Sequence, residues 1–181
     1  MSPSLSTLAV ILGLGYALPQ AYGVLSPASL AVSLRKFSRS VAVGFVLVMI
    51  GTLWFMANLR GESIADFEGL KPVLYIVFLL VGVGACVFVQ DFLAVRGAAV
   101  VMLLLAKLVL DAARWSDSPW SLVVKIWAYV FVVCGIWFTV SPWRMRDILN
   151  WNASSLSRLR FLSAIRLAFG LFVMFLGLKA F

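Results

Sequence analysis

Six apolar runs of similar length divide this chain and constrain its fold more than any other feature. A helix needs about 20 residues to cross the roughly 30 Å hydrocarbon core of a bilayer. Each run is close to that length, and none alternates apolar and polar residues as a membrane barrel strand does. The runs cover residues 5–23, 40–58, 72–90, 97–113, 122–140 and 161–181. We therefore predict an all-α integral membrane protein, a bundle of six transmembrane helices arranged as three helical hairpins.

The composition supports this class. Of the 181 residues, 64% are hydrophobic and 12% are charged, whereas a soluble domain has roughly 45–50% apolar and about 25% charged residues. So few polar side chains do not cover a water-soluble globule, which excludes a soluble enzyme, a disordered chain and a soluble binding module. The six runs and their connections use nearly all of residues 1–181, so we predict a single transmembrane domain.

The charge distribution and the absence of histidine argue against several classes of function. The net charge is +8, but the basic residues lie near the ends of the runs, where anionic lipid headgroups attract them, so we expect no nucleic acid partner. The chain has no histidine, which removes the usual axial ligand of haem, the commonest zinc or copper ligand and the usual neutral-pH base. We expect no metal, no cofactor and no catalytic residue, and hence no enzyme.

The distribution of Lys and Arg predicts the topology. The connections after the first, third and fifth runs, with the start of the sixth, hold nine basic residues: Arg35, Lys36, Arg39, Arg96, Arg144, Arg146, Arg158, Arg160 and Arg166. The opposite side holds five: Arg60, Lys71, Arg114, Lys125 and Lys179. Because basic connections stay in the cytoplasm, we expect both termini outside it. Short loops and a compact chain favour a bacterial inner membrane.

Glycines mark the second and sixth runs in the same way. Gly44 and Gly51 are seven residues apart, as are Gly170 and Gly177, so each pair lies on one helix face. Small residues let transmembrane helices approach closely, and we predict that these four glycines pack helices together.

The same segments suggest a duplication. A Ser-Pro pair follows the first and the fifth run, at Ser26-Pro27 and Ser141-Pro142, and a basic stretch precedes each glycine pair. We predict a parallel repeat of hairpins 5–58 and 121–181 around a shorter middle hairpin, 72–113.

Tryptophans and one amphipathic segment belong at the membrane surface. Indole prefers the headgroup level, so we expect Trp115 and Trp120 to anchor the outer interface and Trp143 and Trp151 the inner one. Pro142 to Trp151 reads as a short interfacial helix, with proline in its first turn. The alternative is that this segment docks onto a partner protein.

One polar stripe interrupts the fourth run. Lys107, Asp111 and Arg114 are spaced for one helix face. The functional interpretation is an ion or proton path with Asp111 as the exchanging group. The structural interpretation, which we favour, is an intrahelical ion pair near the outer surface, because the stripe has one carboxylate and nothing continues it inward. A second polar group, Glu62, Asp66 and Glu68, is expected to form a solvated outer loop, because its spacing is not that of a calcium loop.

These observations favour a non-catalytic polytopic membrane protein, a structural or accessory subunit of a larger membrane complex. Its expected partners are the lipid bilayer and other membrane protein subunits, with a homo-oligomer as the alternative. The second hypothesis is a small-solute or ion transporter that uses the stripe on the fourth helix. A transporter usually has carboxylates near the midplane, whereas the acids here lie near the ends of the runs.

Overall fold

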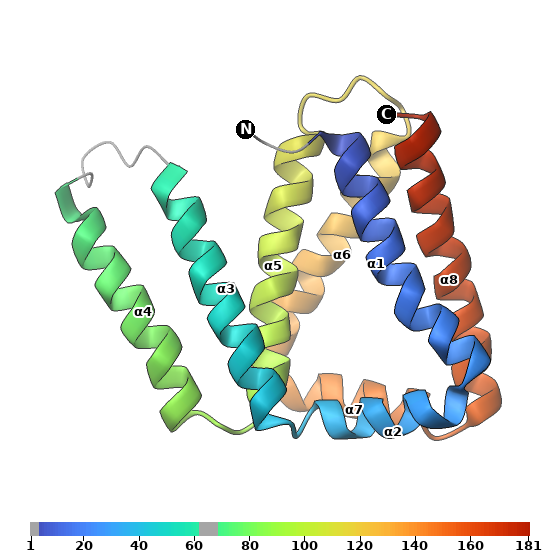
Figure 1. Ribbon diagram of the computed structural model, residues 1–181, viewed down its shortest axis with the longest axis horizontal. Helices are drawn as coiled ribbons and strands as arrows, with labels where there is room; N and C mark the ends of the chain where they lie inside the picture. The colour runs from blue at the N-terminus through green and yellow to red at the C-terminus, as the bar shows by residue number, and fades with distance from the viewer. Residues whose placement is uncertain (1–3, 62–68) are drawn as a thin grey trace.

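The computed structural model describes residues 4–61 and 69–181, and most of these residues lie in eight helices (Figure 1). Its helices are α1 (Leu5–Leu25), α2 (Pro27–Phe37), α3 (Val41–Gly61), α4 (Lys71–Phe88), α5 (Leu93–Ala113), α6 (Ser121–Val140), α7 (Pro142–Asn152) and α8 (Leu156–Lys179). Six of these described helices, all except α2 and α7, are long and apolar enough to cross a membrane. The predicted all-α membrane bundle is therefore confirmed. The spans predicted as hairpin partners, α1 with α3, α4 with α5 and α6 with α8, do not pack extensively on each other among the described residues. The acidic loop of Glu62, Asp66 and Glu68 lies outside the described residues.

Helices suit this chain because a span in lipid must satisfy its backbone hydrogen bonds internally. The helix ends use local chemistry. Ser4 Oγ accepts a hydrogen bond from the Thr7 N–H at 3.2 Å at the start of α1, and Ser155 Oγ accepts one from the Arg158 N–H at 3.5 Å at the start of α8. Because of this cap, α8 begins five residues before the apolar run from Phe161, and it carries Arg158 and Arg160 in its first turns.

The two Ser-Pro pairs form the same junction. Ser26 has φ −133° and ψ 65°, and Ser141 has φ −129° and ψ 72°. Each serine N–H donates to the carbonyl four residues earlier at 2.8 Å, and each following proline begins an 11-residue helix. Proline suits a first helical position because its missing N–H has no partner there. The middle hairpin lacks this helix, although Val89 after α4 has a similar φ of −122° and ψ of 58°. The sequence duplication itself stays a prediction.

The spans form two groups joined by a helical layer (Figure 1). α1 packs along α8, α5 packs between α3 and α6, and α4 packs on the outer side of α3. The helices α2 and α7 lie across one end of the spans, which we call the α2–α7 end. Leu5 and Lys179 lie at the opposite end, which we call the terminal end. The helix predicted at residues 142–151 is present as α7, and a second short helix, α2, lies beside it. Their location at a membrane surface stays a prediction.

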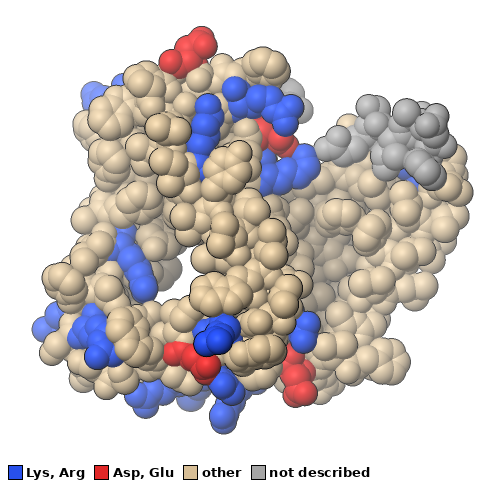
Figure 2. All heavy atoms as spheres, turned by 180° about the vertical axis from the view of Figure 1, so that it is seen from behind, with Lys and Arg blue, Asp and Glu red and all other residues tan. Residues whose placement is uncertain are grey.

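The α1–α8 pair and the α5–α6 pair lie apart near the α2–α7 end. Figure 2 shows an opening through the molecule between them. Because the view is across the helix axes, this opening runs along the plane of a membrane rather than through it. At the α2–α7 end, Arg35 Nη2 donates to the Ala153 carbonyl at 2.8 Å, and Ala31 packs with Ala153 and Leu159. These contacts hold α2 to the α7–α8 connection and to α8, while α7 also contacts α5 and α6.

Candidate functional site

The polar stripe on α5 is a compact set of ion pairs. Lys107 Nζ lies 2.7 Å from Asp111 Oδ2, and Arg114 Nη2 lies 3.6 Å from Asp111 Oδ1. Both cations therefore face the same carboxylate from opposite sides along the helix. The side chains of Lys107 and Asp111 are each 44% exposed. An exposed pair of this kind contributes about 0.2–1 kcal/mol.

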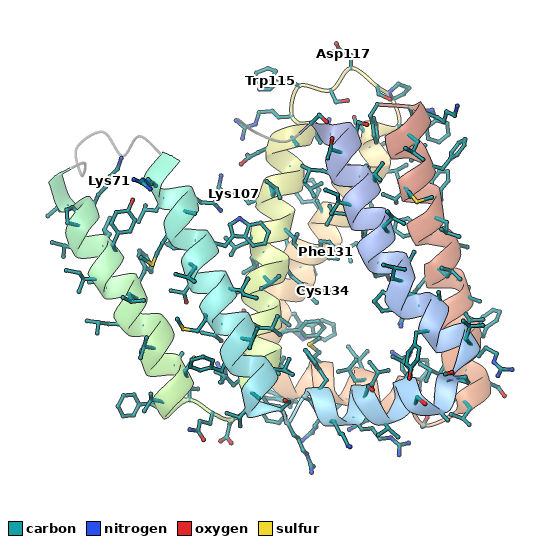
Figure 3. All side chains as sticks on the ribbon, in the orientation of Figure 1. Lys71, Lys107, Trp115, Asp117, Phe131 and Cys134 are labelled. Atoms are coloured by element: carbon teal, nitrogen blue, oxygen red, sulfur yellow. The ribbon has the colours of Figure 1, made fainter. Side chains whose placement is uncertain are left out.

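The stripe is confined to the terminal half of α5. Lys107 points into the space between α5 and α3 (Figure 3), where it lines a cavity of about 350 Å³ together with Asn58 and Leu59. The other lining residues are Phe55, Val100, Leu103 and Leu104, which are apolar. This geometry can hold a small group beside a cation. It supplies a single carboxylate, whereas proton relays in membranes use chains of ionisable groups.

A second cavity lies between α3, α4 and α5, and we call it the α4 groove. Its volume is about 270 Å³, and its lining is almost entirely apolar, including Gly51, Phe78, Gly82 and Ala85. The polar exceptions are Thr52 on α3 and Arg96, which lies in the second turn of α5 near the α2–α7 end. The Arg96 Nε atom is buried and has no hydrogen-bond partner among the described residues. A buried donor without a partner costs free energy. A group that accepts a hydrogen bond from Arg96 Nε would remove this cost, so the groove favours a ligand with an acceptor beside Arg96.

The α4 groove exists because α4 is held by one neighbour. Of the described helices, α4 packs extensively only against α3, where Thr52 lies directly against Gly82. In α4, only Gly82 and Cys86 are buried. Leu80, Val81 and Phe88 are 65%, 61% and 86% exposed. Sequence reasoning missed the groove, because every run is apolar all round and no periodicity distinguishes a helix facing lipid from one facing protein.

An aromatic cluster connects α1, α6 and α8 above the opening. The ring centroids of Tyr16 and Trp127 are 5.3 Å apart, as are those of Trp127 and Phe169. The Phe131 ring is tilted against Trp127, with 5.0 Å between the ring centroids, and lies on the side of α6 that faces α1 (Figure 3). Because α8 begins at Leu156, Arg166 lies about three turns into the span, deeper than the sequence run indicated.

The structure places the four predicted glycines in interfaces within the chain. A Cβ on Gly44 would lie 2.6 Å from the Ala94 backbone nitrogen, and one on Gly51 would lie 2.8 Å from Val100. A Cβ on Gly170 would lie 3.0 Å from the Gly13 carbonyl oxygen, and one on Gly177 would lie 2.8 Å from Val10. The first pair thus faces α5 and the second faces α1. Their effect on stability stays a prediction.

The four predicted anchoring tryptophans lie on the surface at the two ends. Trp115 is 85% exposed in the connection after α5 at the terminal end (Figure 3), and Trp120 is 49% exposed at the start of α6. Trp143 and Trp151 on α7 are 46% and 57% exposed. Arg158 lies over the Trp151 ring at 4.3 Å, a cation–π contact. Their anchoring role in a membrane stays a prediction.

Comparison with known protein families, with curated proteins and with solved structures finds no match to this chain. Within residues 4–61 and 69–181, no group of three or more Cys, Asp or Glu side chains is placed to hold a metal ion. Among the sites described above, the α4 groove is the one lined by a buried donor that has no hydrogen-bond partner among the described residues.

Proposed function

We propose that this protein is a non-catalytic subunit of a larger membrane complex, and that the α4 groove receives a transmembrane helix of a partner subunit. The observation that carries the proposal is the buried Arg96 Nε without a partner among the described residues, at one end of a largely apolar groove. A partner helix with a carboxylate near the α2–α7 end would satisfy this arginine. In a low-dielectric site, such a charge-assisted bond is strong.

The shape of the groove supports the same occupant. Gly51 and Gly82 already pack against Val100 and Thr52 within the chain. Ala85 in the lining, however, is partly exposed, and small residues allow close backbone approach between transmembrane helices. From Val48 to Phe55 on α3, and from Phe78 to Ala85 on α4, the lining extends over two turns of each helix, about 10 Å. A partner helix that lies in the groove would therefore contact α3 and α4 over about two helical turns.

The cellular setting belongs to this proposal. The nine basic residues on the α2–α7 side, against five on the terminal side, favour the α2–α7 end in the cytoplasm and both termini outside it. A bacterial inner membrane fits the short connections. A homo-oligomer is the alternative assembly, in which a helix of a second copy fills the groove.

The test is purification of the native protein in mild detergent, followed by mass spectrometry of what remains bound. We expect a stoichiometric membrane protein with an Asp or Glu near the cytoplasmic end of one span. The variants Val81→Trp, which fills the groove, and Arg96→Gln, which removes its charge, should lose this partner. Val83→Trp is the matched control, because Val83 is 43% exposed on the same helix and does not line the groove.

A charge exchange makes the test specific. Arg96→Glu should lose the partner, and the partner's carboxylate changed to arginine should restore it. A protein that purifies alone as a monomer, or a partner retained equally by Val81→Trp and Val83→Trp, would overturn the proposal. Gly44→Leu and Gly170→Leu are unsuitable variants here, because those glycines pack helices within the chain.

The second candidate is a small-solute or ion transporter that uses Lys107 and Asp111. The observation that favours it is the cavity of about 350 Å³ that Lys107 lines. Its test is solute flux into liposomes, with loss of flux in Asp111→Asn and partner retention unchanged.

A further inference from the structure

A polar pocket of about 230 Å³ lies in the α2–α7 layer, separate from the α4 groove. Arg35 on α2, with Ser38 and Arg39 just after it, forms one side. Arg146 and Asn150 on α7 form the other. Three guanidinium groups and no carboxylate line the pocket, so its chemistry favours an anion.

The arginines are held in place from outside the pocket. Arg35 Nη2 donates to the Ala153 carbonyl at 2.8 Å, which leaves its other donors available. Arg146 donates from Nε and Nη2 to Asp147 Oδ1 at 2.9 and 2.8 Å, and it lies 5.5 Å from the centre of the Phe92 ring. Asp147 is exposed and does not line the pocket. Two helices far apart in the sequence thus present fixed guanidinium groups to one volume.

Phosphate oxygens match these donors. A guanidinium group presents N–H donors in a planar fork, which fits phosphate in a bidentate way. The pocket is lined from α2 and α7, and these helices lie at the level where the spans end (Figure 1), which is the headgroup level of a bilayer. Figure 2 shows that Lys and Arg side chains outnumber Asp and Glu at this end. Basic pockets at the cytoplasmic side of transmembrane helices bind anionic headgroups.

We propose that this pocket binds the phosphate of an anionic phospholipid headgroup, with Arg35, Arg39 and Arg146 as the ligands. The lipid bridges α2 and α7, so it holds the two helices of this layer together. The site is independent of the α4 groove and of the proposed function, because it shares no lining residue with that groove.

The test uses the full chain in mixed micelles that contain either phosphatidylglycerol or phosphatidylcholine, with native mass spectrometry of the retained lipid. We expect one phosphatidylglycerol to remain bound, and phosphatidylcholine to be retained much less. The double variant R39Q/R146Q should lower phosphatidylglycerol retention at least about tenfold, because hydrogen bonds to charged groups contribute about 1.5–3 kcal/mol each. K36Q/R144Q is the matched control, since it removes two charges from the same two segments outside the pocket lining.

Two single variants keep the test decisive if the double variant folds poorly. Asn150→Asp places a carboxylate at the pocket lining and should weaken retention. Asp147→Asn releases Arg146 from its ion pair and should strengthen retention. Equal loss in R39Q/R146Q and K36Q/R144Q would overturn the proposal in favour of general surface charge, as would equal retention of the two lipids. Displacement of phosphatidylglycerol by millimolar inorganic phosphate, at constant ionic strength, would overturn the lipid as the source of the phosphate.

Discussion

Gly13 on α1 and Gly170 on α8 lie against each other's backbone. A Cβ on Gly13 would lie 2.7 Å from the Gly170 carbonyl oxygen, and a Cβ on Gly170 would lie 3.0 Å from the Gly13 carbonyl oxygen. Backbone atoms do not rotate away as side chains do. The contact therefore fixes the separation of α1 and α8, the most extensive helix pair among the described residues.

The first prediction concerns this contact. Gly13→Ala and Gly170→Ala should each lower the free energy of unfolding by about 1–3 kcal/mol, because the added methyl group forces the helices apart. Gly15→Ala is the control on the same helix, since nothing lies within 4 Å of its added Cβ. It should be neutral or slightly stabilising, as alanine is the better helix former. Unfolding in detergent followed by circular dichroism measures all three. Equal losses for positions 13 and 15 would contradict the packing role.

The second prediction concerns the aromatic cluster. Trp127 is 8% exposed and contacts Tyr16 and Phe169, so it joins α6 to both α1 and α8. Trp127→Ala should cost about 3 kcal/mol of unfolding free energy, as other large core truncations do. Trp137→Ala on the same helix is the control, because Trp137 is 47% exposed, and it should cost less than about 1 kcal/mol. Similar thermal transitions for the two variants would show that the cluster does not hold the two groups of helices together.

The sequence predicts the elements of this fold well for physical reasons. A transmembrane helix must be a long apolar run, because lipid offers no partner to its backbone, so the six spans follow from the chain. The helix at Pro142 follows from its proline and its mixed polarity. The start of α8 was harder to place, because Arg158 and Arg160 lower the local hydropathy although Ser155 already caps the helix there.

The arrangement of the spans was not predictable in the same way. Dispersion rather than the hydrophobic effect drives packing between helices in lipid, so apolar side chains face both lipid and protein. Nothing in the apolar run of α4 shows that it lies outside α3, or that Arg96 ends beside the groove between them. The α5 stripe could be predicted from the sequence, because three charged residues at helical spacing stand out in an apolar run.

The third prediction is the topology. In a background with Cys86→Ala and Cys134→Ala, Asp117→Cys in the α5–α6 connection should react with an impermeant thiol reagent on intact cells. Lys36→Cys on α2 should react only after permeabilisation. The reason is the excess of basic residues at the α2–α7 end, which is retained in the cytoplasm. The reverse pattern of labelling would invert the orientation and move the proposed phosphate site to the outer leaflet.

The fourth prediction separates the two candidate functions at Asp111. Its carboxylate pairs with Lys107 at 2.7 Å and with Arg114 at 3.6 Å, but its side chain is 44% exposed. Solvent screens such pairs, so Asp111→Asn should lower the free energy of unfolding by less than about 1 kcal/mol and leave partner retention unchanged. Asp117→Asn is the control with the same charge change at the same end of the molecule. Under the subunit proposal, liposomes with either variant show the same solute flux as those with the unmodified protein. A flux that requires Asp111 and tolerates Asp117→Asn would instead assign the cavity beside Lys107 to transport.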